Sequence, residues 1–148
     1  MLELGAGVGL AGLAAAAVGS RVLQTDRDAD ALALCKENAE RNELRTEQRV
    51  ADWATNPELG RFDWVIAADV LYRSTLHEHL STLFHASLAP NGRLLLADPF
   101  RSASVQFLEL LEEKGWGVMM SRWMIGEREG WESRAIGVFE LKAPSAAV

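Results

Sequence analysis

Glycine occupies every second position of a short segment near the start of the chain, where residues 3–9 read E-L-G-A-G-V-G. Glycine lets a backbone turn sharply at the end of a strand and approach a ligand without a Cβ in the way. The residues that follow, 10–20, are rich in alanine and leucine and predict a helix. A strand, a glycine loop and a helix in this order form the first unit of an α/β fold that binds a ligand at the loop.

Hydrophobic patterning then alternates between strand and helix periods, with strand-like runs over 21–26, 47–53, 62–70 and 92–99 and helical patterns over 29–42, 75–88 and 104–114. The run over 62–70 is apolar enough to be buried on both faces, as a central parallel strand is. The last two runs, 116–126 and 133–142, have no helix between them and should pair antiparallel. The pattern predicts one α/β domain over residues 1–142, with a doubly wound, mostly parallel sheet and a C-terminal hairpin, and a tail over 143–148.

Composition narrows the classes of function. Fifteen Lys and Arg face 21 Asp and Glu, a net charge of −6, which argues against nucleic-acid binding and favours a small-molecule or protein partner. Cys35 is the single cysteine, so no intramolecular disulfide can form and a cytoplasmic setting is expected. No apolar run has the length of a membrane span, and His77, His79 and His85 lack the spacing of zinc ligands. We expect a monomer with neither a membrane segment nor a metal.

The glycine loop itself fits two kinds of cofactor. Residues 3–9 match the E-x-G-x-G-x-G loop of S-adenosylmethionine enzymes, and residues 7–12 match the dinucleotide motif G-x-G-x-x-G, with Asp26 at the spacing of a ribose-binding acid. Glu3 favours the first, because S-adenosylmethionine carries a cationic amine and a sulfonium, whereas a pyrophosphate would be repelled. The terminal hairpin is also not the usual completion of a dinucleotide domain. We therefore expect S-adenosylmethionine as the cofactor.

Acidic residues end the next two strands, at the edge where doubly wound sheets bind ligands. Asp26 can accept both ribose hydroxyls, whereas Asp28 is better explained as the N-cap of the following helix. Asp52 and Trp53 offer an acceptor and an indole ring for adenine. The alternative for this pair is a core tryptophan beside a turn-forming aspartate.

The residues after the fourth strand make the pattern more specific. Asp69-Val70-Leu71-Tyr72 resembles the D-x-x-Y signature of a group of seven-β-strand protein-lysine methyltransferases, and the resemblance runs from Met1 to about Lys142 through L-E-L-G-A-G-V-G-L, Thr25-Asp26, Asn38, Asn42 and Asp52-Trp53. It implies a Rossmann-like sheet of strand order 3-2-1-4-5-7-6 and methyl transfer from S-adenosylmethionine to a lysine nitrogen. Members act on chaperones, elongation factors and the electron-transfer flavoprotein β subunit, and L-L-L-A-D-P-F-R at 94–101 is similar to the last branch.

The resemblance also assigns roles to residues. Its cofactor contacts fall on Gly5, Ala6, Gly7, Asp26, Trp53 and Ala68, to which the loop and strand-end arguments add Glu3, Gly9 and Asp52. Asp69 and Tyr72 would border the target amine, with Asp69 holding the incoming ammonium. The alternatives are an Asp69 that caps the next helix and a Tyr72 that only packs. Trp131 could contact substrate.

Two other functions stay open at this point. A methyltransferase for a small nitrogen-containing metabolite would share the same fold, because fold alone does not fix the substrate. In the family a segment precedes the first strand and supplies an aromatic contact to the cofactor, and this chain begins inside that strand. We therefore expect the N-terminal part to be missing, which leaves a non-catalytic methyltransferase-like domain as the third possibility.

Overall fold

The computed structural model describes residues 1–126 and 133–144, so Trp131 lies outside the described residues. Seven strands form one sheet in the order β3-β2-β1-β4-β5-β7-β6, which confirms the predicted strand order. The strands are β1 Leu2–Leu4, β2 Leu23–Asp26, β3 Glu47–Val50, β4 Phe62–Ala68, β5 Leu88–Asp98, β6 Gly117–Ile125 and β7 Arg134–Lys142. The helices are α1 Leu10–Ala17, α2 Ala29–Arg41, α3 His77–Ser87 and α4 Ser102–Glu113, with short 3-10 turns at Trp53–Thr55 and Ser74–Leu76. The first five strands are parallel, and β7 is antiparallel to both of its neighbours.

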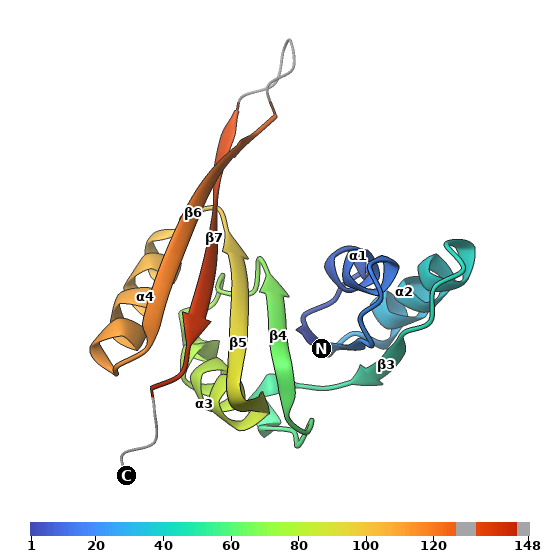
Figure 1. The fold of residues 1–148 in the computed structure, drawn as a ribbon, viewed down its shortest axis with the longest axis horizontal. Helices are drawn as coiled ribbons and strands as arrows, with labels where there is room; N and C mark the ends of the chain where they lie inside the picture. Colours follow the sequence, from blue (N-terminus) through green and yellow to red (C-terminus); the bar gives the residue numbers. More distant parts are fainter. Residues whose placement is uncertain (127–132, 145–148) are drawn as a thin grey trace.

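The order in which the strands are added to the sheet changes direction between β3 and β4. The strands β1, β2 and β3 extend from the centre to one edge, and the chain then returns to the centre at β4 and continues toward the hairpin at the other edge. Because crossovers between parallel strands are right-handed, the reversal places α1 and α2 on one side of the sheet and α3 and α4 on the other (Figure 1). The carboxyl ends of β1 and β4, which pair with each other, therefore form the crevice in which such sheets bind ligands.

The buried faces of the helices are those that the sequence pattern predicts. α2 buries Leu32, Cys35 and Ala39; α3 buries Leu80, Leu83, Phe84 and Ser87; and α4 buries Ser104, Phe107, Leu108 and Leu111. Asp28 is the N-cap of α2, and its side chain accepts from the backbone N–H groups of Asp30 and Ala31. The centre of β4, over 65–67, is buried as a central strand should be. These faces pack against the sheet, α2 on one side of it and α3 and α4 on the other (Figure 1).

Two of the differences from the predicted boundaries have a clear physical cause. β3 ends at Val50, because Asp52 caps the 3-10 turn that follows instead of continuing the strand. Pro90-Asn91-Gly92 does not separate a helix from a strand but lies inside β5, which begins at Leu88. Leu88 pairs with Phe62 and Arg93 with Trp64, so residues 89–92 form a bulge opposite a single residue of β4. A bulge accommodates the proline, which has no N–H to give to the ladder.

The C-terminal hairpin pairs antiparallel, as predicted, and extends past the end of its neighbour. β5 ends at Asp98 opposite Gly137, while β6 and β7 continue to Ile125 and Arg134 (Figure 1). β6 is the edge strand and leaves large apolar side chains exposed, namely Met119, Met120, Trp123, Met124 and Ile125. Within residues 1–126 and 133–144, no helix combines the length and the apolar character needed to cross a membrane.

A buried carboxylate ties the start of α1 to the sheet. Glu3 is 4% exposed, and its side chain accepts hydrogen bonds from the Gly12 backbone N–H at 3.0 Å and from Gln24 Nε2 at 2.7 Å. Gly12 has no room for a side chain, because a Cβ there would lie 2.2 Å from Glu3 Oε2 and 2.6 Å from Gln24 Nε2. The glycine in α1 is therefore required by packing and not by backbone conformation.

We expect Gly12→Ala to destabilise the chain, although alanine is favoured over glycine inside a helix by about 1 kcal/mol. The added Cβ displaces the carboxylate and the amide, and overpacking of this kind costs about 1–3 kcal/mol. Gly117→Ala is the matched control, since a Cβ there would meet nothing within 4 Å. Urea unfolding followed by tryptophan fluorescence measures both changes. Equal stability of Gly12→Ala and the wild type would show that the carboxylate moves aside at no cost.

Candidate functional site

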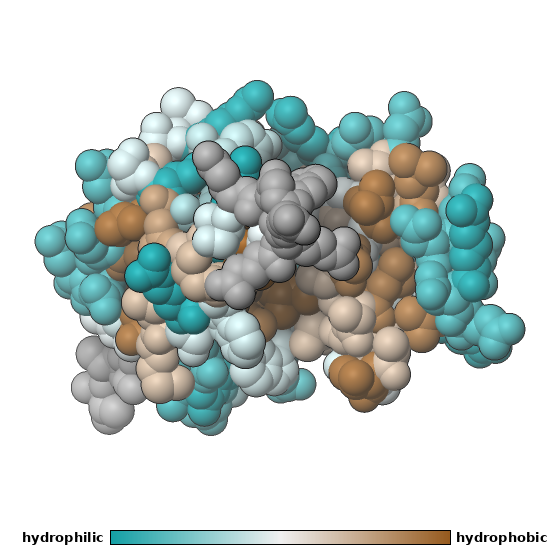
Figure 2. All heavy atoms as spheres, turned by 90° about the horizontal axis from the view of Figure 1, so that it is seen from above, coloured by the Kyte–Doolittle hydropathy of each residue, from teal (hydrophilic) through white to brown (hydrophobic). Residues whose placement is uncertain are grey.

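A cavity of about 270 Å³ opens at the carboxyl ends of β1, β2 and β4, at the point where the chain direction reverses. It brings together most of the residues predicted from the sequence, namely Gly5, Asp26, Asp52, Trp53, Ala68, Asp69 and Tyr72. Figure 2 looks onto the end of the molecule from which the hairpin rises and shows hydrophobic surface in the hollow between its two halves. The cavity therefore has a mixed lining, with carboxylates along its rim.

The glycine loop wraps the end of β1 and is held to β2. The Ala6 N–H donates to the Thr25 carbonyl at 3.0 Å, and the Gly7 N–H donates to Asp26 Oδ2 at 2.9 Å. Gly5 has a φ of 67°, and a Cβ there would lie 2.9 Å from Val70 Cγ1. Ala6, Gly7 and Gly9 do not line the cavity; they shape the turn that places Gly5 and Asp26 at its wall, and their contact with a cofactor stays a prediction.

Asp26 presents its carboxylate at the end of β2. Oδ2 accepts from the Gly7 N–H and Oδ1 accepts from the Asp28 N–H at 3.0 Å. Each carboxylate oxygen has two lone pairs, so both oxygens can accept a further hydrogen bond from a ligand. The side chain is half-buried and fixed in direction by the loop. This arrangement suits an acceptor for a pair of neighbouring hydroxyls.

Asp52 and Trp53 lie on the same wall, at the 3-10 turn after β3. Asp52 Oδ1 accepts from the Ala54 N–H at 3.0 Å, which makes it the cap of that turn. The Trp53 ring lies 3.2 Å from the Cβ position of Gly5. Trp53 Nε1 is buried and has no hydrogen-bond partner among the residues that the structure describes.

Glu3 lies beneath the loop and not in the cavity. Burial raises the pKa of its carboxyl above the ordinary value and outweighs the hydrogen bonds from Gln24 and Gly12, which favour the charged form. Its geometry therefore gives Glu3 a role in holding the loop. A direct attraction for the cationic part of a cofactor stays a prediction.

Asp69 follows β4 in a left-handed backbone conformation, with a φ of 60°. Its N–H donates to the Ala97 carbonyl at 2.8 Å, and its carboxylate pairs with Arg101. Neither the 3-10 turn at Ser74–Leu76 nor α3 has a side-chain cap, so the helix-capping alternative for Asp69 is wrong. Its side chain is 64% exposed at the rim of the cavity. Asp69 is therefore accessible to an incoming ligand, although its carboxylate is paired with Arg101.

Tyr72 also lies at the cavity rim and is 47% exposed. The Arg73 guanidinium carbon lies 5.6 Å from the centre of its ring, within the range of a cation–π contact. At this exposure Tyr72 is not a core residue, and a role for its ring beyond packing stays a prediction. The ring forms part of the wall beside Asp69.

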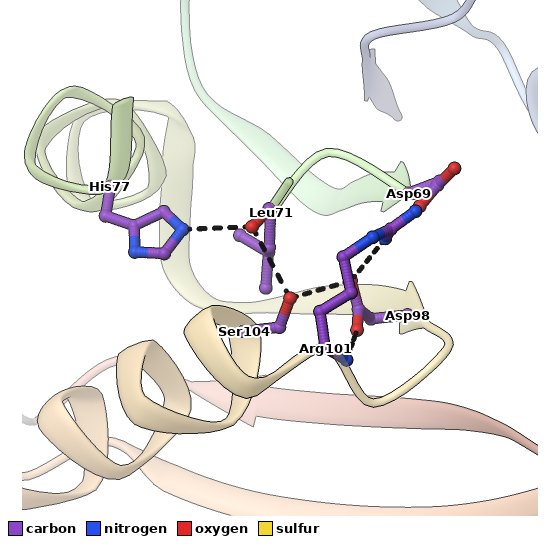
Figure 3. Close-up of polar contacts among 6 residues, drawn as sticks. All are labelled: Asp69, Leu71, His77, Asp98, Arg101 and Ser104. Atoms are coloured by element: carbon purple, nitrogen blue, oxygen red, sulfur yellow. Dashed lines mark hydrogen bonds and ion pairs between the residues drawn. The ribbon is translucent and has the colours of Figure 1, made fainter. Parts of the chain in front are cut away.

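Sequence reasoning missed a polar cluster next to Asp69, drawn in Figure 3. Arg101 Nη1 bridges Asp69 and Asp98 Oδ2, the latter at 3.1 Å, and Ser104 Oγ donates to Asp98 Oδ2 at 2.9 Å. The Leu71 carbonyl accepts from His77 Nε2 at 3.1 Å and lies 3.4 Å from Ser104 Oγ. The cluster thus fastens the loop that carries Asp69 and Tyr72 to the segment after β5. The sequence feature that could have indicated this cluster is D-P-F-R at 98–101, which contains both Asp98 and Arg101.

The three histidines contact separate groups. His77 bonds the Leu71 carbonyl, His79 Nδ1 lies 3.3 Å from Asn56 Oδ1, and His85 Nε2 accepts from Trp116 Nε1 at 3.2 Å. In the described part of the chain, no three His, Cys, Asp or Glu residues gather closely enough to hold a metal ion.

The strand order, the glycine loop after β1 and the acid at the end of β2 define the seven-stranded, Rossmann-like methyltransferase class of α/β domains. The chain belongs to the lysine methyltransferase family, whose pattern matches residues 1–114. Protein N-lysine methyltransferase METTL21A of Mus musculus is 37% identical to it over 123 residues, which cover 76% of this chain. The chain spans 56% of the length of that mouse protein.

Solved structures agree on the fold. Precorrin-6y C5,15-methyltransferase from Geobacter metallireducens GS-15 superposes with a TM-score of 0.78 at 18% identity, covering 97% of this chain and 78% of that one. Magnesium protoporphyrin IX methyltransferase (ChlM) from Synechocystis PCC 6803, crystallised with bound SAM, superposes with a TM-score of 0.68 at 20% identity, covering 93% of this chain and 68% of that one. At these identities the likeness concerns the fold alone.

The raised pKa of Glu3 makes the stability of the chain depend on pH. Between the ordinary carboxyl value of 4.5 and the higher folded value, the folded chain holds a proton that the unfolded chain has released. The contribution of the Glu3 carboxyl to the free energy of unfolding is therefore greatest below pH 4.5, and it is lost as the pH rises through the folded pKa. Glu3→Gln lacks this loss, so its free energy of unfolding relative to the wild type should rise across the window. Urea unfolding at a series of pH values checks this, and a constant difference would contradict it.

Proposed function

We propose that the chain is an S-adenosylmethionine-dependent N-methyltransferase that transfers a methyl group to a lysine side chain of a protein. One observation carries the proposal: Asp69, an exposed carboxylate, shares a single cavity with the glycine loop and Asp26. One side of that cavity can hold a nucleoside-containing cofactor, and the other presents an acid to a cation. The family membership of residues 1–114 supports the same conclusion.

The cofactor side of the cavity fits S-adenosylmethionine in three respects. Asp26 offers two oxygens to the ribose hydroxyls, and the Trp53 indole offers a flat ring beside the adenine position. Gly5 leaves open the space that a Cβ would fill between Val70 and Trp53. We assign Ala68 and Asp69 to the end of the cofactor that carries the sulfonium, and Asp52 and Trp53 to the adenine end.

On the acceptor side, Asp69 attracts the lysine ammonium and fixes its direction toward the cavity. When bound, S-adenosylmethionine supplies an electrophilic methyl group on a sulfonium. Alignment of the amine with that group is the main requirement of the reaction, and orientation alone can supply about 7–11 kcal/mol of rate enhancement. Tyr72 forms the wall of the channel through which the lysine side chain enters. Asp69 and Tyr72 therefore position the nucleophile and exclude water.

The proposed acceptor is a protein. The mouse relative is named a protein N-lysine methyltransferase, and the net charge of −6 disfavours nucleic acid as a partner. The single cysteine is consistent with a cytoplasmic enzyme. We expect the chain to act as a monomer.

S-adenosylmethionine should raise the thermal midpoint of the chain, whereas NAD should not. A ligand that binds only the folded state stabilises it by about 2.7 kcal/mol at a concentration of ~100 Kd. Asp26→Ala should abolish most of this shift, because the ribose hydroxyls lose their acceptor. Asp63→Asn, at the opposite end of β4, is the control and should keep it. Differential scanning fluorimetry measures the shift, and stabilisation by NAD alone would overturn the cofactor assignment.

Asp69→Asn should lower the rate of methyl transfer by at least ~100-fold, the range of a positioned acid–base group. Asparagine keeps the size and tolerates the left-handed backbone at this position, so folding and cofactor binding should change little. Asp63→Asn is again the control. The assay incubates the chain with radiolabelled S-adenosylmethionine and a cell lysate and separates label in protein from label in small molecules.

The distribution of label between the protein fraction and the small-molecule fraction identifies the class of methyl acceptor. Label in one or a few protein bands, lost in Asp69→Asn, supports the proposal, and mass spectrometry should then find the methyl group on lysine. Label confined to small molecules would replace the protein acceptor with a metabolite. Near-normal turnover by Asp69→Asn would remove Asp69 from the chemistry.

A further inference from the structure

An arginine stands between two carboxylates on the acceptor side of the cavity. Arg101 Nη1 pairs with Asp69 and lies 3.1 Å from Asp98 Oδ2 (Figure 3). Asp69 follows β4 and Asp98 ends β5, so the guanidinium bridges two neighbouring strand ends. The hydrogen bond to Asp69 is the largest cause of a pKa of Arg101 raised above its usual value. Arg101 therefore stays charged while it occupies the acid proposed to receive the substrate.

The two acids hold this arginine with unequal strength. The Asp98 side chain is only 1% exposed, while that of Asp69 is largely in solvent. Asp98 also accepts from the Arg101 backbone N–H at 3.0 Å and from Ser104 Oγ. Leaving a buried charge without its partner costs far more than breaking an exposed ion pair. Arg101 is therefore anchored at Asp98, and its contact with Asp69, although it raises the pKa of Arg101 most, is the one that solvent and a competing cation can reach.

The backbone next to Arg101 is held in a strained shape. Phe100 has a φ of 61°, which is rare for a bulky residue. Its ring packs edge-on against Phe139 with 5.8 Å between centroids, above Gly137, where a Cβ would lie 2.9 Å from Phe100 Cζ. Strain that packing maintains is often found where a group must be positioned. Here it turns the chain so that Arg101 faces both acids.

A carboxylate alone would leave a target lysine in the wrong protonation state. Asp69 attracts the ammonium form and by the same attraction raises the pKa of the amine. Only the neutral amine has the lone pair that attacks a methyl group, and a free lysine has a pKa near ~10.4. A positive charge close to the amine opposes this effect, because like charges disfavour the protonated form.

We propose that Arg101 is a positioning residue that holds Asp69 until the acceptor lysine arrives and then remains on Asp98, where its charge promotes loss of the lysine proton to solvent water before the neutral amine attacks. This inference rests on the proposed function. Asp69, Asp98 and Arg101 together leave one negative charge, enough to attract one ammonium. The other titratable groups that line the cavity or contact the 69–72 loop are Asp26, Arg27, Asp52, Tyr72, Arg73 and His77. Among these groups the two acids and the two arginines contribute equal and opposite charges. The net charge near the acceptor position is therefore set by Asp69, Asp98 and Arg101.

The pH dependence of the rate tests the effect on the lysine proton. The comparison keeps Asp98, because the proposal needs that anchor, and uses Arg101→Gln, whose neutral amide can still donate to Asp98. Arg101→Gln should move the rising limb of the kcat profile up by about one pH unit, a ~10-fold slower rate on that limb. Arg101→Lys keeps the positive charge and should remove most of the shift. Superimposable profiles, with the rate lowered equally at every pH, would show a structural role and overturn the proposal.

Side-chain NMR tests the exchange at Asp69 without turnover, so it is independent of the lysate experiment. The chain is labelled with ¹⁵N-arginine and titrated with n-butylammonium, an analogue of the lysine side chain, in the presence of S-adenosylhomocysteine, which has no methyl group to transfer. The Arg101 guanidinium signal should move saturably toward the position it has in Asp69→Asn and should not respond in that variant. Asp63→Asn should respond as the wild type does. An Arg101 signal that ignores n-butylammonium overturns the exchange, whereas a lysate without labelled protein overturns the proposed function.

Discussion

The Glu3 carboxylate accepts hydrogen bonds from α1 and from β2, and through Gln24 it reaches further elements. Gln24 Oε1 accepts from Cys35 Sγ at 3.1 Å and from Gln48 Nε2 at 3.2 Å, which adds α2 and β3 to the same network. Because these polar groups lie largely out of solvent, changing one leaves a partner unsatisfied. The direction of the glycine loop, and with it the place of Asp26 at the cavity wall, depends on this network.

A second buried acid, Asp98, lies on the other side of the cavity and is satisfied differently. Glu3 takes its hydrogen bonds from neutral donors of the fold itself, whereas Asp98 is paired with a guanidinium that also reaches the exposed Asp69. The first arrangement has no group that can leave without unfolding the loop. The second contains one exposed ion pair, which can open at small cost. On the proposed assignment, the cofactor side is held by a buried network, and the acceptor side contains the one ion pair of this cluster that is exposed to solvent.

Gly5, Asp26 and Trp53 meet at one cavity as the sequence pattern predicts, because each lies at or just after the end of a strand. Gly5 follows β1 directly, Asp26 ends β2 and Trp53 lies three residues after β3, so an alternating pattern of strands and helices places them at one edge. Arg101 could not be assigned in this way. It meets Asp69 across 32 residues, and the contact depends on β5 lying beside β4 and on a left-handed Phe100, which no local propensity indicates. The bulge in β5 was missed for the same reason, because strand register is set by the partner strand.

The left-handed backbone at Asp69 has a consequence for how such a chain can vary over generations. At a φ of 60° the residues that fit without strain are glycine, asparagine and aspartate. Codons for asparagine and for glycine are each a single-base change from a codon for aspartate. A lineage can therefore lose the carboxylate in one mutational step while keeping the turn, the fold and the cofactor cavity intact. Under the role proposed for Asp69, folded relatives that keep the cofactor cavity but lack the acid for the acceptor are a single codon change away.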